Sequence, residues 1–119
     1  MSGQERRSAP RVRAYHPVRL QKPNNPQVVE TLTKDLSLGG IRCLSAAIFP
    51  VSSDVNVNLI LSTGEESLSV KGRAVWFRMI PYSEQFDLGI SFGMISPYNK
   101  RRLSVYIDNL SEKSATVSP

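Results

Sequence analysis

The amino-acid sequence predicts a mainly β fold: a small six-stranded antiparallel β-barrel, preceded by a flexible basic arm and followed by one C-terminal α-helix. Three observations support this class. Six short segments are rich in β-branched or alternating apolar residues, and turn-forming residues separate them. Apolar residues near the end of the chain recur at helical spacing instead. An open sheet of six short strands would expose two edges, and closure into a barrel removes them.

The six strands are expected in order at residues 17–20, 27–35, 41–45, 55–61, 68–76 and 86–92. Lys22-Pro23-Asn24-Asn25-Pro26 has the composition of a turn and separates the first two. Residues 55–61 and 68–76 carry apolar side chains with a period of two, and we expect them to form a hairpin. The same alternation places Trp76 on the face shared by Leu68, Val70 and Ala74.

The C-terminal helix is expected to begin at Ser96-Pro97, with serine as the N-cap and proline at the first helical position. Its apolar face is formed by Leu103, Tyr106, Ile107 and Leu110. The predicted organisation is therefore a flexible arginine-rich arm at residues 1–13, a barrel with its helix at residues 14–112, and a polar tail at residues 113–119.

The excess positive charge is confined to the start of the chain. The protein has 119 residues, which suits one domain, and a net charge of +5. Residues 1–22 contain six basic residues and one acidic residue, so the remainder is neutral overall. A local basic segment suggests an anionic partner that binds there, and the alternative is a solvated tail. No apolar run is long enough to span a membrane and there is no signal peptide, so we expect a cytoplasmic protein without membrane insertion.

The usual signatures of enzymes and metal sites fail. The chain has one histidine and one cysteine, and no ligand cluster has the spacing of a zinc site. No glycine-rich phosphate loop is present. We interpret His16 as a surface or capping residue and Cys43 as a small core residue. The sequence therefore predicts a binding protein without a cofactor or metal, and not an enzyme.

The first binding motif lies in the basic arm, where Arg7 and Arg11 have the spacing RxxxR. In an extended chain the two side chains are about 13 Å apart, which allows them to contact different parts of one nucleotide-sized ligand. The guanidinium group makes bidentate hydrogen bonds to phosphate oxygens and to the O6 and N7 atoms of guanine. It also stacks on the face of a base.

The second motif is DxSxxG, formed by Asp35, Ser37 and Gly40 where one expected strand ends and the next begins. Residues two apart on a strand point to the same face, so Asp35 and Ser37 can act together. The carboxylate can accept from guanine N–H groups or hold an arginine, and the hydroxyl can bind a phosphate. Gly40 permits a close backbone approach by a ligand. The alternative is an ordinary turn between strands.

The order and spacing of these motifs resemble the PilZ domain family, and the resemblance covers nearly the whole chain. The later segments Gly72-Arg73-Ala74-Val75-Trp76 and Asp87-Leu88-Gly89-Ile90-Ser91-Phe92 also look like strands of that family. The resemblance implies a six-stranded barrel that recognises cyclic di-GMP through both motifs. It implies ligand-binding roles for Arg7, Arg11, Asp35, Ser37 and Gly40.

Three further residues are candidates through the same resemblance. Trp76 lies where some family members place a side chain against the ligand, although core packing is an equal alternative. Arg78 is expected to face the same side as Trp76. Arg6, just before RxxxR, resembles members that bind an intercalated pair of cyclic di-GMP molecules. A third guanidinium would stack on the extra guanine and offset the added phosphate charge.

The expected mechanism is ordering of the arm over the barrel when ligand binds, which changes a surface that an unidentified protein partner can recognise. One alternative is a PilZ-like protein-interaction module that binds no nucleotide. Another is a small barrel for single-stranded nucleic acid. That function needs aromatic residues interleaved with basic ones on strands, whereas here the aromatic residues are scattered, so we expect no nucleic-acid polymer as partner. A homodimer is left open.

Overall fold

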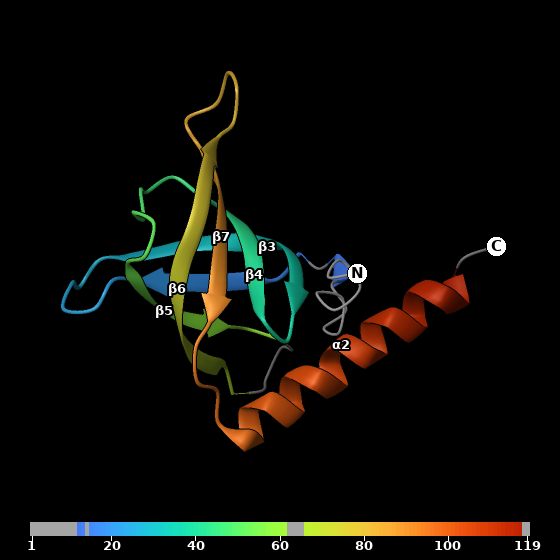
Figure 1. Ribbon diagram of the computed structural model, residues 1–119. Helices are drawn as coiled ribbons and strands as arrows, with labels where there is room; N and C mark the ends of the chain where they lie inside the picture. Colours follow the sequence, from blue (N-terminus) through green and yellow to red (C-terminus); the bar gives the residue numbers. More distant parts are fainter. Residues whose placement is uncertain (1–11, 14, 62–65, 118–119) are drawn as a thin grey trace, which may run out of the picture.

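The computed structural model describes residues 12–13, 15–61 and 66–117, with side chains as far as Leu110 (Figure 1). The elements are β1 (Val12–Arg13), β2 (Pro17–Gln21), β3 (Val28–Ser37), β4 (Gly40–Ser45), β5 (Asp54–Leu59), β6 (Leu68–Met79), β7 (Phe86–Phe92) and α2 (Pro97–Val117). The six expected strands and the helix are all present, and the predicted fold class is confirmed.

The strands form one antiparallel sheet in the order β1-β3-β2-β5-β6-β7-β4, and a further pairing of β3 with β4 closes it (Figure 1). Strand β3 has ten residues, which allows its first half to pair with β2 and its second half with β4. The expected hairpin of β5 and β6 is confirmed, with Val57 opposite Val70. Closure leaves no open edge between β3 and β4, as the edge argument predicts.

The seventh strand was not expected. The arm was predicted to be irregular through residue 13, but Val12 and Arg13 pair with Leu36 and Asp35 at the end of β3. Two residues of strand are too short to show a periodic pattern in the sequence, and the pairing depends on the free side of β3 at that point. Val12 and Arg13 therefore join the barrel beside the DxSxxG motif.

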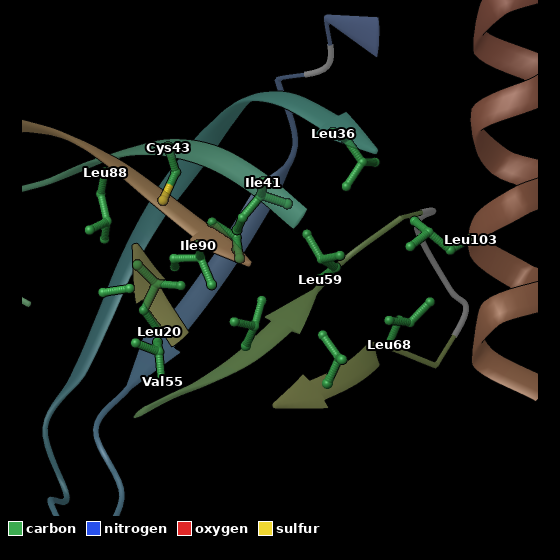
Figure 2. Packing of buried hydrophobic residues seen from close by; sticks show 14 of the residues in the cluster. Leu20, Leu36, Ile41, Cys43, Val55, Leu59, Leu68, Leu88, Ile90 and Leu103 are labelled. Carbon is green, nitrogen blue, oxygen red and sulfur yellow. The ribbon is translucent and has the colours of Figure 1, made fainter. Parts of the chain in front are cut away.

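Alternate strand residues fill the interior of the barrel, as Figure 2 shows. Fully buried side chains include Leu20 from β2, Leu36 from β3, Val55 and Leu59 from β5, and Leu88 from β7. Burying an aliphatic side chain of this size contributes about 1.5–3 kcal/mol. Cys43 belongs to the same core, and its burial, followed by the nearby carboxylates of Asp87 and Asp35, raises the thiol pKa to about 12. The interpretation of Cys43 as a core residue is confirmed.

Helix α2 begins as predicted. The Ser96 hydroxyl accepts a hydrogen bond of 3.1 Å from the Asn99 N–H, which caps the first turn. Leu103 and Ile107 are buried and pack on the core. The helix continues to Val117, through the segment where we expected a polar tail from residue 113. Within the described part of the chain, no helix is long and apolar enough to cross a membrane.

Helix α2 is also tied to the start of the barrel through His16. The Tyr106 hydroxyl lies 2.5 Å from Nε2 of His16, and the two rings meet edge to face with centroids 4.9 Å apart. The His16 backbone N–H donates to the Thr33 hydroxyl at 3.0 Å. Burial lowers the pKa of His16. The surface or capping role predicted for this residue is therefore too simple, because its ring joins two distant parts of the chain.

Candidate functional site

Two β-bulges shape the outer face of the sheet formed by β3, β4, β7 and β6. One interrupts the register of β3 with β4 between Thr33 and Asp35, and the other interrupts the register of β6 with β7 between Ala74 and Trp76. A bulge inserts one extra residue and turns the following side chains to the other face. The two bulges therefore change which side chains of β3 and β6 reach this face, which we call the outer face.

A continuous row of residues crosses the outer face from strand to strand. Arg13 is opposite Asp35, Asp35 is opposite Arg42, Arg42 is opposite Gly89, and Gly89 is opposite Trp76. Side chains directly opposite each other on one face of a sheet are close enough to interact. The structure thus places Asp35 of the DxSxxG motif and Trp76 in one row, although they are far apart in the sequence.

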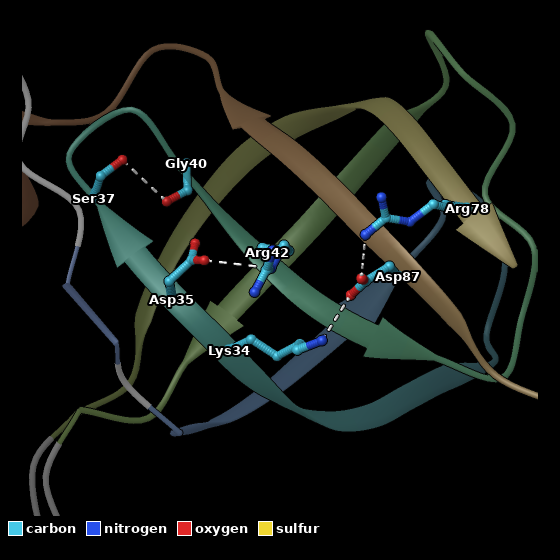
Figure 3. A network of polar contacts seen from close by, with 7 residues as sticks. All are labelled: Lys34, Asp35, Ser37, Gly40, Arg42, Arg78 and Asp87. Carbon is cyan, nitrogen blue, oxygen red and sulfur yellow. Dashed lines mark hydrogen bonds and ion pairs between the residues drawn. The ribbon is translucent and has the colours of Figure 1, made fainter. Parts of the chain in front are cut away.

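Asp35 forms an ion pair with Arg42 in this row (Figure 3). The Nε atom of Arg42 lies 3.3 Å from Oδ2 of Asp35. Asp35 is buried, whereas about a third of the Arg42 side chain is exposed. The Nε atom is itself buried and makes no hydrogen bond of good geometry within the described residues. The contact between Arg42 and Asp35 is therefore one of charge, in which the Arg42 Nε–H makes no hydrogen bond of good geometry.

Ser37 and Gly40 flank the turn between β3 and β4. The Ser37 hydroxyl accepts from the Gly39 N–H at 3.1 Å and donates to the Gly40 carbonyl at 3.4 Å (Figure 3). Ser37 is buried, so the serine turn that the sequence also allowed is present. A Cβ atom on Gly40 would overlap the Ile90 carbonyl oxygen. The glycine is thus required by the close approach of β7, a reason that the sequence did not reveal.

Asp87 lies between two cations on the same face. Its carboxylate accepts from Lys34 Nζ at 3.2 Å and from Arg78 Nη2 at 3.1 Å (Figure 3). Burial alone would raise the pKa of Asp87, but the hydrogen bonds from Arg78 and Lys34 and the charges of Lys34 and Arg42 outweigh it. The pKa is consequently lowered. Arg78 lies on the same side as Trp76, as expected, and its guanidinium is mostly exposed.

The bulge turns Trp76 to the outer face, so core packing, one of the two alternatives left open for it, is not observed. The residue opposite it is Gly89, and 39% of its surface is exposed. The inner face of β6 is occupied by Leu68, Val70 and Ala74, all of them buried. Trp76 therefore contributes an exposed aromatic surface to the outer face instead of packing in the core.

A shallow cavity of about 320 Å³ adjoins the row on the β6 side. Its lining includes Lys71, Arg73 and Ser91, and Arg73 makes a 3.7 Å ion pair with the exposed Asp54. Ser91 pairs with Gly40 of β4 on one side and with Arg73 of β6 on the other. The cavity therefore lies at the same height along the strands as the turn between β3 and β4. The two cations in this lining, Lys71 and Arg73, suit the binding of an anionic group such as a phosphate.

The outer face brings together the candidates Asp35, Ser37, Gly40, Trp76 and Arg78. Arg6, Arg7 and Arg11 lie outside the described residues, although Arg13 just after them is paired with Asp35. Sequence reasoning did not single out Lys34, Arg42, Gly89 or Asp87 for this face. The sequence does show opposite charges at Lys34, Asp35 and Arg42. Strand alternation alone could not place these three side chains on one face of the sheet, because Lys34 and Asp35 are neighbours. In residues 12–13, 15–61 and 66–117, no group of three or more potential ligands could hold a metal ion.

Comparison with known structures reveals the same fold in three proteins. The PilZ domain of YcgR from Escherichia coli, solved with cyclic di-GMP, has a TM-score of 0.70 and 18% identity, over 92% of this chain and 94% of that one. The Bacillus subtilis inhibitor of motility MotI/DgrA has a TM-score of 0.77 and 18% identity, covering 95% and 53%. The MrkH–cyclic di-GMP complex of K. pneumonia has a TM-score of 0.79 and 16% identity, covering 94% and 55%.

The chain spans about half the length of MotI/DgrA and of MrkH, and nearly all of the YcgR domain. No curated protein sequence matches it significantly. The model of the PilZ domain family matches residues 5–109, which includes both motifs, every strand and most of the helix. This protein therefore belongs to the PilZ domain family.

Proposed function

We propose that this protein is a receptor for cyclic di-GMP. The nucleotide binds on the outer face and undergoes no chemical reaction there. The observation that supports this most is the single row joining Asp35, Arg42 and Trp76 across four strands. It combines a carboxylate, a guanidinium and an exposed indole, which are the groups that recognise a guanine edge, a phosphate and a base face. YcgR and MrkH, which share the fold, were solved with this ligand.

In this proposal the residues have different tasks. Arg7 and Arg11 contact guanine edges and phosphates from the arm, while Asp35 accepts from a guanine or holds one of these arginines. Ser37 and Gly40 keep the β3–β4 turn in place, and their backbone lies beside the ligand. Trp76 provides a stacking surface, and Arg78 supplies a cation at the edge of the site. Arg42 adds a guanidinium that the sequence had not suggested.

Isothermal titration calorimetry tests the proposal, with cyclic di-GMP as ligand and GMP as the control ligand. We expect binding by the wild type, none by GMP at the same concentration, and loss of binding in Arg7→Ala and Asp35→Ala. Arg19→Ala is the matched control, because Arg19 is an exposed arginine that pairs with Glu30 on the β2–β3 side of the barrel. The absence of heat with wild-type protein at moderate salt would refute the receptor function.

We infer from Arg6 that two molecules of cyclic di-GMP bind per chain. The extra guanidinium offsets the charge of the added phosphates and stacks on the additional guanine. The cavity beside Lys71 and Arg73 offers space for anionic groups next to the first molecule. The same titration measures the stoichiometry. A value near two for wild type and near one for Arg6→Ala is expected, and a value of one for the wild type would contradict the inference.

We further propose that binding orders the arm and so creates the surface read by a partner protein. The pairing of the first described residues, Val12 and Arg13, with Leu36 and Asp35 of β3 supports this proposal. NMR relaxation of backbone amides 4–11 with and without cyclic di-GMP tests this step. Reduced mobility with ligand is expected, and unchanged relaxation in a sample shown to bind would contradict it.

A PilZ-like protein-interaction module remains the second candidate, and one observation favours it. The end of the β6–β7 hairpin exposes Phe77, Met79 and Tyr82, with exposures of 40%, 68% and 108%. Exposed aromatic and methionine side chains are common at protein interfaces. If titration with cyclic di-GMP gives no heat, this hairpin becomes the first surface to mutate in a search for the function.

A further inference from the structure

Gly89 and Trp76 form an unusual pair in the middle of the outer face. They are directly opposite each other on β7 and β6. A Cβ atom on Gly89 would overlap the Cε2 and Nε1 atoms of the indole and would lie 2.9 Å from Cδ1. Because three ring atoms crowd the place of the missing side chain, the indole lies across the glycine backbone and not beside it. Any larger residue at position 89 would displace the ring.

Glycine in the interior of a strand weakens the strand, so its presence calls for a local reason. At Gly89 the local reason is the indole of Trp76. The other two glycines compared, one in β6 and one in β4, are crowded by different atoms. Gly72 would meet the Ile90 side chain and the Ser91 carbonyl, and Gly40 would meet the Ile90 carbonyl. Only at Gly89, among these three, does the space belong to a side chain of the outer face.

The consequence is a fixed orientation of the aromatic ring. The indole lies over Gly89, and 39% of Trp76 remains exposed, so part of its surface is open to solvent. The next residue in the row is Arg42, followed by Asp35. The indole therefore lies at the same level of the sheet as the Asp35–Arg42 ion pair. A planar base lying on the ring could present its edge toward these charged groups.

We propose that Gly89 is a positioning residue of the ligand site: it allows Trp76 to lie flat on the sheet, so that a guanine base of cyclic di-GMP stacks on the exposed surface of the indole. This inference rests on the proposed receptor function and deepens it. Gly89 acts through Trp76 and makes no ligand contact of its own. The competing explanation is that the indole only covers a glycine and stabilises the barrel, without any effect on the ligand.

A double-mutant cycle separates these explanations, with the dissociation constant for cyclic di-GMP measured by calorimetry on the full chain. Stacking of one base on an aromatic side chain is worth about ten-fold or more in affinity. We expect Gly89→Ala and Trp76→Leu each to weaken binding by about that factor. In the Trp76→Leu background, where no indole remains to be displaced, Gly89→Ala should change the dissociation constant less than about two-fold.

Trp76 is the single tryptophan of the chain, so its fluorescence reports directly on the site. The ligand-free Gly89→Ala variant should show a shifted emission relative to wild type, because the ring is displaced. Cyclic di-GMP should quench the wild-type emission by stacking and quench the variant less. Val57→Ala is the control for loss of stability, because Val57 is buried on β5 opposite Val70 and Leu20, away from the indole and the proposed site. It should lower stability while leaving the affinity and emission unchanged.

Several results would overturn the inference. One is a Gly89→Ala variant that binds cyclic di-GMP with wild-type affinity. Another is that Gly89→Ala weakens binding as much in the Trp76→Leu background as it does in the wild type. If Gly89→Ala does not fold, the affinity of Trp76→Leu tests the stacking surface that Gly89 serves, and wild-type affinity in that variant overturns the inference. Absence of binding by wild type would remove the receptor function itself, whereas wild-type binding with an unaffected Gly89→Ala removes only the role of Gly89.

Discussion

Asp87 is a buried carboxylate held between cations that come from two other strands. Lys34 reaches it from β3 at 3.2 Å and Arg78 reaches it from β6 at 3.1 Å. Burial of an unpaired carboxylate would be strongly unfavourable, so the two hydrogen bonds are what allow Asp87 to remain charged inside the surface. Both cations keep part of their side chains in solvent, and each can be hydrated if the carboxylate is lost.

Replacement of Asp87 by asparagine should therefore lower the free energy of unfolding by about 1.5–3 kcal/mol at neutral pH, the range for hydrogen bonds to charged groups. Because the folded pKa of Asp87 is lowered, its contribution is complete above its ordinary value of 3.8 and is lost as pH falls through the folded pKa. Urea unfolding at pH 7, 5 and 3 measures this. The difference between wild type and variant should shrink toward zero at the lowest pH.

Asp54→Asn is the matched control for this measurement. Asp54 pairs with Arg73 at 3.7 Å, and both side chains are about two thirds exposed, so its charge should contribute little to stability. A loss in Asp54→Asn as large as that in Asp87→Asn would show that general charge balance, and not the buried pair, determines the result. A difference for Asp87→Asn that stays constant down to pH 3 would also contradict the prediction.

Single residues of the site were predictable where their chemistry is local. Asp35 and Ser37 were identified because turn-forming and charged residues follow each other in a short motif. Lys34 was not, because strict alternation puts neighbours on opposite faces and the bulge brings Lys34 to the same face as Asp35. Alternation alone likewise groups Trp76 with the inner residues of its strand, and the bulge turns it outward. A bulge depends on how two strands twist against each other, which a single sequence does not state.

Among the elements, helix α2 follows its sequence signals at the start more closely than at the end. The cap at Ser96 and the buried pair Leu103 and Ile107 appear as expected. The last turns run on to Val117 without a glycine or proline to stop them. The strands show the same pattern, because their presence was predicted and some of their ends were not. Strand β3 ends two residues later than expected and β6 ends three residues later.

Removal of the N-cap tests how much the start of the helix contributes. Ser96→Ala deletes the acceptor for the Asn99 N–H and should lower the free energy of unfolding by about 1 kcal/mol. Ser104→Ala, inside the same helix, should cause no loss, because alanine is the better helix former. Urea unfolding monitored by circular dichroism compares the two. Equal stability of Ser96→Ala and wild type would contradict the capping role.

At the scale of the whole molecule, closure of the barrel depends on β3. This strand pairs with β1, β2 and β4, and its bulge lies where it passes from one partner to the next. The need to remove sheet edges predicted a barrel, but the identity of the strand that closes it follows from strand length and bending. The contact of His16 with Tyr106, 90 positions apart in the sequence, then holds the helix against the start of the barrel.

The His16 contact predicts a second acid-sensitive step, at a higher pH than that of Asp87. Burial lowers the pKa of His16, so the unfolded chain takes up a proton near pH 6.5 while the folded protein still resists it. Stability should therefore be highest above pH 6.5, decrease as pH falls through that value, and level off below the folded pKa. His16 is the single histidine, and no other unperturbed side chain titrates in this range.

Urea unfolding at half-unit steps from pH 8 to pH 3 should thus show two separate decreases in the wild type. His16→Gln should abolish the first and keep the second, while Asp87→Asn should keep the first and abolish the second. Additivity is expected because the two groups lie in different regions of the barrel and share no partner. If His16→Gln still loses stability between pH 7 and pH 5, a group other than His16 causes the first decrease, which would contradict the prediction. The helix is also held to the barrel by the buried Leu103 and Ile107 and by the hydrogen bond from the Asn99 amide to the Ser69 carbonyl.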